Sequence, residues 1–207
     1  TFDGTHMLRL NGEHEDKGVT KYVKKDASNF TLPIGVVHEG NRYYTPAVYD
    51  FTSNDKDNCS ITVKAINSIH NNLTFDPSKW LAYYWMVTTE GFGEDGRDNF
   101  SIKSTDFSVT QTYYYPAEKL LGTSDTLFPE YMYYGGTDEY KWIDLRGDGT
   151  TGSELANIGT NNVTFKPFGH IAGDYTVGVV GSNAEDNAGI YTGRPVLYTR
   201  GDGGGDW

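Results

Sequence analysis

Aspartate-rich loops hold the side chains of this chain that could coordinate a metal ion. One loop carries Asp95 and Asp98, and another carries Asp144 and Asp148. Calcium takes roughly six to eight oxygen ligands, and such loops supply carboxylate and carbonyl oxygens together. The second loop departs from a calcium-binding helix-loop-helix, because Arg146 stands at its third position. Solvated turns explain both loops without a metal, so we expect no cofactor and keep one bound calcium ion as the alternative.

Aromatic side chains in one predicted hairpin form the candidate ligand-binding surface. Two aromatic runs flank Gly135 and Gly136, a pair that predicts a turn. Alternate residues of a strand point to the same face, so we expect four rings to share a face. These rings belong to Tyr131, Tyr133, Tyr140 and Trp142. Aromatic faces stack on sugar rings, and packing in the protein core is the alternative.

Groups suited to catalysis are scattered along the chain. The 5 histidines show no metal-ligand spacing, and neither a nucleophile elbow nor a phosphate loop is present. The single cysteine, Cys59, excludes an internal disulfide, and we expect a buried, inert thiol at the start of a strand. Glu130 and Glu139 are the pair that a glycosidase would need. We expect no enzyme, and a surface glycan-active enzyme that uses this pair remains an alternative.

Composition and charge indicate which classes of partner this chain does not bind. The chain has 207 residues and a formal net charge of −11. An acidic protein repels polyanions, so neither nucleic acid nor an anionic membrane is expected as a partner. No apolar run approaches the roughly eighteen residues of a membrane-spanning helix, so we expect no membrane insertion.

Strands are the elements that must position these groups. Apolar and polar residues alternate with period two at residues 61–65, 81–87, 163–167 and 175–179. The rich content of Tyr, Phe, Trp and Gly favours strands and turns. Residues 116–121 begin with Pro116 and predict one short helical turn. The sequence therefore predicts an all-β, antiparallel β-sandwich, Ig-like or jelly-roll-like, with at most one helical turn and with Trp85 between the sheets.

Several short runs follow one another in a fixed order. They are Tyr22-Val23-Lys24-Lys25, Phe30-Thr31-Leu32-Pro33-Ile34-Gly35, Tyr43-Tyr44-Thr45-Pro46-Ala47-Val48, then Tyr84-Trp85-Met86-Val87 and Gly173-Asp174-Tyr175-Thr176. This order resembles large cell-surface proteins of the Bacteroidota that the type IX secretion system exports, among them gliding and adhesion proteins. Leu32 stands where that family usually has a second phenylalanine. Between the second and third runs we expect an excursion at residues 36–42, permitted by Gly35 and Gly40, and a return strand opened by Pro46. On physical grounds alone, an ordinary edge hairpin is the alternative at this place.

The resemblance implies an extracellular module at the outer cell surface. Its expected role is that of a non-enzymatic spacer or adhesive module in a long chain. The implied partners are the type IX export machinery, through the parent chain, and a surface glycan or a host or substratum ligand. A carbohydrate-binding module that uses the aromatic hairpin is the alternative.

The resemblance also implies boundaries and one modification. We expect residues 1–195 to form a single module, with residues 1–28 as lead-in strands, and residues 196–207 to form a linker into a following module. Asp125-Thr126-Leu127 fits the short O-glycosylation signal that Bacteroidota use on exported proteins. Thr126 is therefore the expected glycosylation site.

Overall fold

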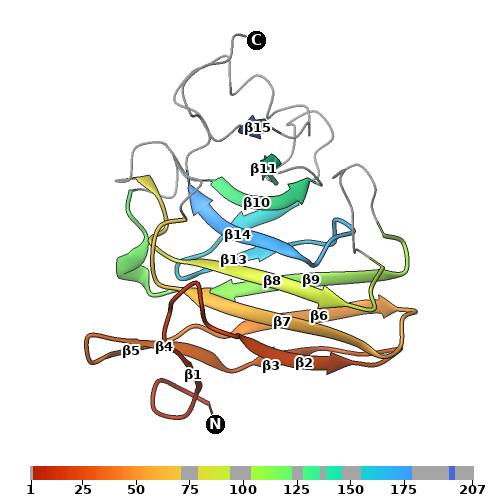
Figure 1. Cartoon of the computed structure of the whole chain (residues 1–207), viewed down its shortest axis with the longest axis horizontal. Helices are drawn as coiled ribbons and strands as arrows, with labels where there is room; N and C mark the ends of the chain where they lie inside the picture. The colour runs from red at the N-terminus through yellow and green to blue at the C-terminus, as the bar shows by residue number, and fades with distance from the viewer. Residues whose placement is uncertain are drawn as a thin grey trace.

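The computed structural model of the chain describes residues 2–70, 79–93, 104–122, 128–135, 139–145, 155–178 and 196–198. These residues form mainly antiparallel sheets that pack together as a β-sandwich (Figure 1). Helical structure in the described part is a short 3-10 turn, η2, at Ala117–Lys119. The fold class and the helical turn after Pro116 are thus confirmed. Within the same residues, no helix has the length and apolarity needed to cross a membrane.

The larger of the two packed sheets, here called the front sheet, has seven strands among the described residues, in the order β15-β11-β10-β14-β8-β7-β2. Every neighbouring pair in it is antiparallel. Its strands are β2 (Val19–Val23), β7 (Cys59–Ile66), β8 (Tyr84–Glu90), β10 (Phe128–Gly135), β11 (Glu139–Asp144), β14 (Gly173–Gly178) and β15 (Val196–Tyr198).

The second packed sheet, here called the back sheet, has the strand order β12-β13-β9-β6-β3 in the described part of the chain. All of its pairs are antiparallel as well. A β-bulge between Phe51 and Ser53 shifts the register of β6 against β9. The strands are β3 (Phe30–Leu32), β6 (Ala47–Asn54), β9 (Phe107–Tyr114), β12 (Ala156–Ile158) and β13 (Asn162–Phe165).

A third, smaller sheet contains residues 36–42, and it shows that the edge hairpin, which the sequence left open, is the correct alternative. These residues belong to a hairpin of β4 (Ile34–His38) and β5 (Asn41–Tyr44), and β4 also pairs in parallel with β1 (Leu8–Leu10). Gly35 does not break the strand. It lies inside β4, where a Cβ atom would collide with the Met7 side chain and the Tyr43 carbonyl oxygen. Gly40 has the positive φ of 80° that the hairpin turn requires.

The core lies between the front and back sheets, where alternate residues of their strands meet. β9 alternates buried and half-buried residues along its whole length, and Ile61, Val63 and Ala65 of β7 are fully buried. The predicted neighbours of Trp85 are buried as well: Leu81, Tyr83, Val87 and Val177. The Trp85 ring stacks on Tyr113 of the back sheet, with 5.1 Å between ring centroids. The expected position of Trp85 between the sheets is confirmed.

Burial of tyrosine phenols ties the stability of this core to alkaline pH. Burial, with smaller contributions from the carboxylates of Asp174 and Glu15, raises the pKa of Tyr84 from 10.0 to about 12. Burial likewise raises the pKa of Tyr115 to about 12. It also raises the pKa of Tyr83, although a hydrogen bond with the Thr45 hydroxyl opposes the change. The fold therefore favours the neutral phenol at all three positions.

Replacing Trp85 by alanine should lower the free energy of unfolding by about 3–5 kcal/mol, because it removes buried apolar surface and leaves a cavity. Urea denaturation of the purified chain measures this loss. Phe2→Ala serves as the control, since Phe2 is 59% exposed, and it should change stability by no more than about 0.5 kcal/mol. A loss below about 1 kcal/mol for Trp85→Ala would contradict the core described above.

The free energy of unfolding should fall at alkaline pH, because the buried tyrosines then ionise more readily in the unfolded chain. A phenol whose pKa is raised by folding contributes stability that is fully present below pH 10 and is lost as the pH rises toward about 12. Urea denaturation at a series of pH values should show this fall. Tyr84→Phe removes one titrating phenol, so its stability should depend less steeply on pH above 10. An unchanged slope in that variant would show that Tyr84 is not held neutral by the fold.

Candidate functional site

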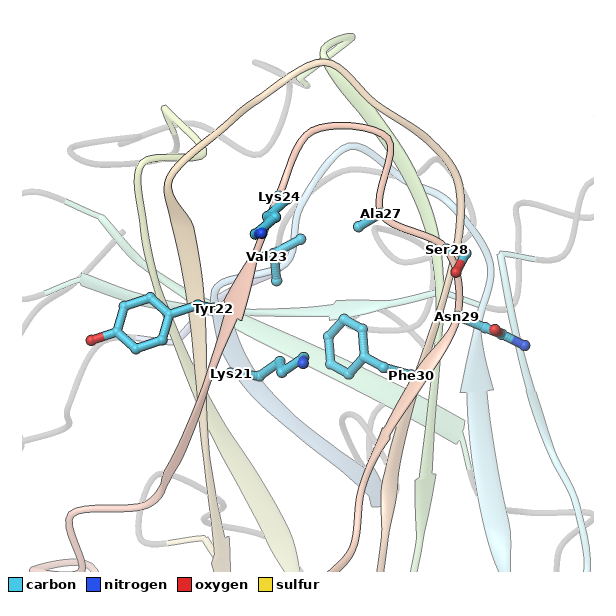
Figure 2. A pocket seen from close by; sticks show the side chains of 8 residues that line it. All are labelled: Lys21, Tyr22, Val23, Lys24, Ala27, Ser28, Asn29 and Phe30. Carbon is cyan, nitrogen blue, oxygen red and sulfur yellow. The ribbon is translucent and has the colours of Figure 1, made fainter.

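A pocket opens along one side of the sandwich, between the edge strands β2 and β3. Its volume is about 250 Å³. Within the described residues each of these strands ends its sheet, so the pocket lies where both sheets stop. We call it the edge pocket. Figure 2 shows its lining residues: Lys21, Tyr22, Val23, Lys24, Ala27, Ser28, Asn29 and Phe30.

Hydrogen bonds fix the loop that forms the arch of the edge pocket. This loop, residues 24–29, carries the chain from β2 to β3 (Figure 2). The buried Asn54 side-chain amide donates a hydrogen bond to the Lys24 carbonyl oxygen, at 2.8 Å. The Asp26 N–H donates to the Asn54 carbonyl oxygen at 2.9 Å, and Asp26 adopts a positive φ of 56°. The loop is therefore anchored to the end of β6, and the pocket is preformed.

The interior of the edge pocket combines an apolar floor with an ammonium group. Phe30 stacks on Tyr49 and on Phe51 of the back sheet, with ring centroids 5.2 and 6.2 Å apart. Val23 is buried beneath the opening. Lys21 and Phe30 point toward one another across the gap in Figure 2, and the Lys21 Nζ lies 5.9 Å from the centroid of the Phe30 ring. A cation over an aromatic face is attracted by the ring quadrupole.

The rim of the edge pocket is basic, in a chain whose net charge is −11. Lys21 and Lys24 are both exposed. No carboxylate of the described residues forms an ion pair with either of them, whereas the adjacent Lys25 lies 4.0 Å from Asp55. The site can therefore receive an anionic group together with a small apolar one.

A second cluster is buried on the outer face of the front sheet. His70 Nε2 lies 2.8 Å from an Asp174 carboxylate oxygen, and their side chains are 8% and 2% exposed. The imidazole also packs edge-on against the Tyr84 ring, with centroids 4.5 Å apart. Because burial makes a charged or polar side chain costly unless it is paired, this contact holds the segment around His70 onto β14.

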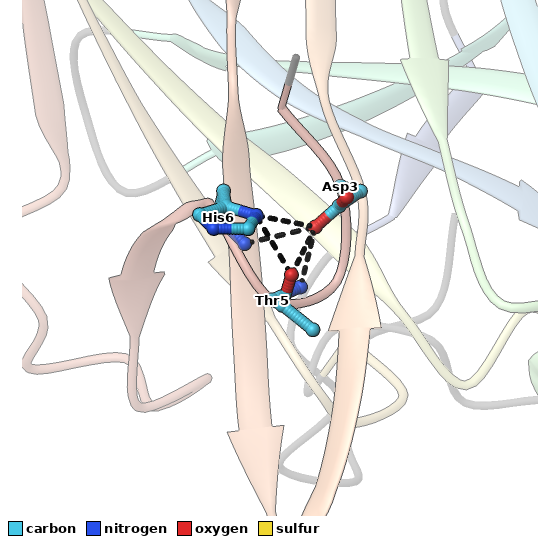
Figure 3. Close-up of polar contacts among 3 residues, drawn as sticks. All are labelled: Asp3, Thr5 and His6. Atoms are coloured by element: carbon cyan, nitrogen blue, oxygen red, sulfur yellow. Dashed lines mark hydrogen bonds and ion pairs between the residues drawn. The ribbon is translucent and has the colours of Figure 1, made fainter.

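A third polar cluster lies at the N-terminal turn and is exposed (Figure 3). The Asp3 carboxylate accepts hydrogen bonds from the Thr5 hydroxyl at 2.6 Å, the Thr5 N–H at 2.8 Å and the His6 N–H at 3.0 Å. These bonds, led by the Thr5 hydroxyl, hold the pKa of Asp3 well below its usual range. This local turn closes on itself through the aspartate side chain, as asparagine and aspartate do in many turns.

The aromatic hairpin forms as expected, but its register separates the four candidate rings. β10 and β11 pair as neighbouring antiparallel strands. Trp142 stands opposite Met132, the residue between Tyr131 and Tyr133. Opposed residues share a face of the ladder, and alternate residues of one strand do too. Tyr131 and Tyr133 thus occupy one set of ladder positions and Tyr140 and Trp142 the other. The expected single face of four rings is wrong, and ligand binding by either pair stays a prediction.

The same register places the backbones of Glu130 and Glu139 far apart along the hairpin, which does not favour a glycosidase pair. Glu139 stands opposite Gly135, which is five residues along β10 from Glu130. At roughly 3.4 Å per residue this separation is about 17 Å. The carboxyl groups of a glycosidase lie roughly 5–10 Å apart. The two glutamates also occupy different sets of ladder positions, so they belong to opposite faces.

The remaining candidates fall mostly outside the described residues. Asp95, Asp98, Asp148 and Thr126 all lie there, so calcium binding and glycosylation stay predictions. Asp144 is the last residue of β11 and stands opposite Glu130. Among the residues that the structure does describe, no group of three or more His, Cys, Asp or Glu side chains could hold a metal ion. Cys59 is buried at the start of β7, as expected, and burial raises the pKa of its thiol.

The sequence did not predict the edge pocket or the His70–Asp174 contact. The edge pocket left one signal, a run of lysines in an otherwise acidic chain: Lys17, Lys21, Lys24 and Lys25. The His70–Asp174 contact left none, because the two residues are 104 positions apart. Only the pairing of β14 with β8 and the return of the chain over the outer face bring them together.

His70→Phe should lower the free energy of unfolding by about 1–3 kcal/mol, because it removes the imidazole that contacts the buried Asp174 carboxylate at 2.8 Å. Urea denaturation measures the loss. His38→Phe is the matched control, since His38 is exposed, and it should change stability by no more than about 0.5 kcal/mol. Equal stability of the two variants would show that the His70–Asp174 contact does not hold the outer layer.

Three comparisons set this chain beside known proteins. No family model, no curated protein and no solved structure matches it. The fold and the sites described above, together with the sequence motifs, therefore carry the argument about function.

Proposed function

We propose that this chain is a non-enzymatic β-sandwich module of a large exported protein, acting outside the cell as a spacer or adhesive unit. The order of the sequence motifs supports a parent among the Bacteroidota cell-surface proteins of the type IX secretion system. The export machinery would then meet the module through that parent chain. The fold is compatible with this role, since β-sandwiches recur in cell-surface proteins.

The observation that carries the proposal is the placement of the first and last described strands. β1 and β15 lie at opposite ends of the molecule (Figure 1). β15 forms one edge of the front sheet and β2 forms the other, six strand spacings away in the order of the sheet. At about 4.8 Å per spacing this width is roughly 29 Å. If the parent chain enters the module at one end and leaves it at the other, each such module lengthens the parent protein by about this width. A spacer requires this property.

The edge pocket supports the adhesive part of the proposal. Residues from two of the runs that carry the resemblance line this pocket: Tyr22 and Val23 end β2, Lys24 follows it, and Phe30 begins β3. Their packing explains why these residues occur together. Val23 and Phe30 join the core, whereas Lys21, Tyr22 and Lys24 face the solvent around it. A preformed, basic opening on a spacer gives it a place to hold a ligand.

Deleting residues 1–198, which include the edge strand β15, from the parent protein should impair surface attachment or export and leave hydrolytic activity in the medium unchanged. Surface display is measured with an antibody against a tag placed after the module, and attachment is measured by adhesion of cells to a substratum. The proposal would be overturned if the purified chain cleaved a polysaccharide, or if the deletion changed neither display nor attachment.

A replacement separates the two roles. An unrelated β-sandwich of similar length, inserted in place of residues 1–198, should restore display if the module acts as a spacer. It should fail to restore attachment if the module is adhesive. Recovery of both properties assigns the spacer role alone.

A further inference from the structure

We infer that the free edge of β2 is a docking site for an extended, acidic segment of another polypeptide, which adds to the front sheet as a further strand. The inference deepens the proposed adhesive role and rests on it. An extended segment that joins a sheet edge gains affinity from main-chain hydrogen bonds and specificity from pockets for its alternate side chains. β2 provides both features.

The backbone of β2 is paired on one side. Each of its residues, Val19 to Val23, stands opposite a residue of β7 in an unbroken antiparallel register. Among the described residues no other strand pairs with β2. An edge strand presents unpaired N–H and C=O groups along its outer side. The pairing with β7 holds these groups in line, so an added strand finds a preformed partner.

The two faces of β2 offer different contacts to an added strand. Val23 and Lys21 belong to the inner face, and the edge pocket lies beside them with Phe30 as its floor. Tyr22 belongs to the outer face, is 78% exposed, and points away from the pocket in Figure 2. A strand that continues the front sheet past β2 places every second side chain over the pocket and the others beside Tyr22. The pocket therefore determines which side chains are favoured at the inward-facing positions of the added strand.

Charge determines which segment fits. Lys21 in β2 and Lys24 directly after it are exposed, and neither forms an ion pair with a described carboxylate. Lysines on an edge strand oppose pairing between two copies of the same edge, because like charges opposite one another are destabilising. The net charge of −11 on each copy adds to that repulsion. Carboxylates of an acidic strand would instead attract the lysines of β2. The favoured occupant is therefore an acidic segment of another polypeptide and not a second copy of this edge.

Binding of defined peptides tests the inference on the purified chain. The probes are two fluorescein-labelled pools of octapeptides in which Val or Thr alternates with a charged residue, Asp or Glu in one pool and Lys or Arg in the other. Fluorescence anisotropy should show binding of the acidic pool alone, weakening as salt is added. Lys21→Glu and Lys24→Glu should each lower the affinity about fivefold, since an ion pair is replaced by repulsion.

Lys166→Glu is the matched control. Lys166 is exposed next to β13, away from β2, and its substitution changes the net charge by the same amount. Its affinity for the acidic pool should equal that of the unchanged chain. Amide hydrogen exchange supplies the main-chain readout. The amides of Val19–Val23 should exchange more slowly when acidic peptide is bound, as expected for a newly paired edge.

Several results would overturn the inference. They are equal binding of the basic pool, binding unaffected by Lys21→Glu and Lys24→Glu, and no binding of either pool. Binding of the acidic peptides without slower exchange in β2 would show that the lysines recognise the acidic side chains alone. The natural ligand would then be a small anion, such as an acidic sugar, and not a strand. Dimers that protect β2 would assign the edge to a second copy. If the peptides fail but deletion of the module still impairs display, the docking edge is wrong and the spacer role stands.

Discussion

The contact of Tyr113 with aromatic rings of both sheets is the interaction on which the rest of this structure depends. Its ring stacks on Trp85 and approaches Tyr175, both on the front sheet, with centroids 5.1 and 5.0 Å away. Its hydroxyl contacts the Tyr49 hydroxyl at 3.0 Å and donates to the Gln111 side chain at 2.9 Å. A buried phenol requires such partners, because an unpaired polar group is costly inside a core. These contacts fix how far apart the sheets lie and which residues face inward.

The edge pocket is an extension of that core. Phe30 stacks on Tyr49, whose hydroxyl meets that of Tyr113, so the pocket floor is held by the same aromatic network. In the described part of the chain the two sheets end at β2 and β3, so the packing between them stops there. The Lys21 ammonium lies over the last aromatic ring, that of Phe30, at 5.9 Å from its centroid. A polar opening is the physical consequence of ending an aromatic core at two edge strands.

The front sheet is covered on its outer face as well, at β14. All six residues of this strand are buried, although only alternate ones face the back sheet. On the outer face, Asp174 meets His70, and the Thr176 hydroxyl donates to the Tyr83 carbonyl oxygen at 3.1 Å. A Cβ atom at Gly178 would collide with the Trp80 ring. Residues such as His70 and Trp80 therefore cover the outer face of β14, which is why this strand has polar and small residues on that face.

The sequence alone determined the fold class, the helical turn after Pro116 and the inward residues of the main strands, because period-two alternation is a local pattern that burial of one face imposes. It also located the hairpin that contains Tyr131 and Trp142. Tertiary structure alone decided how these strands pair. The register of β10 against β11 separated the expected aromatic face, and the return of the chain over β14 joined His70 to Asp174. Register and long-range contacts depend on which surfaces meet, and a shift of one residue exchanges the two faces of a strand.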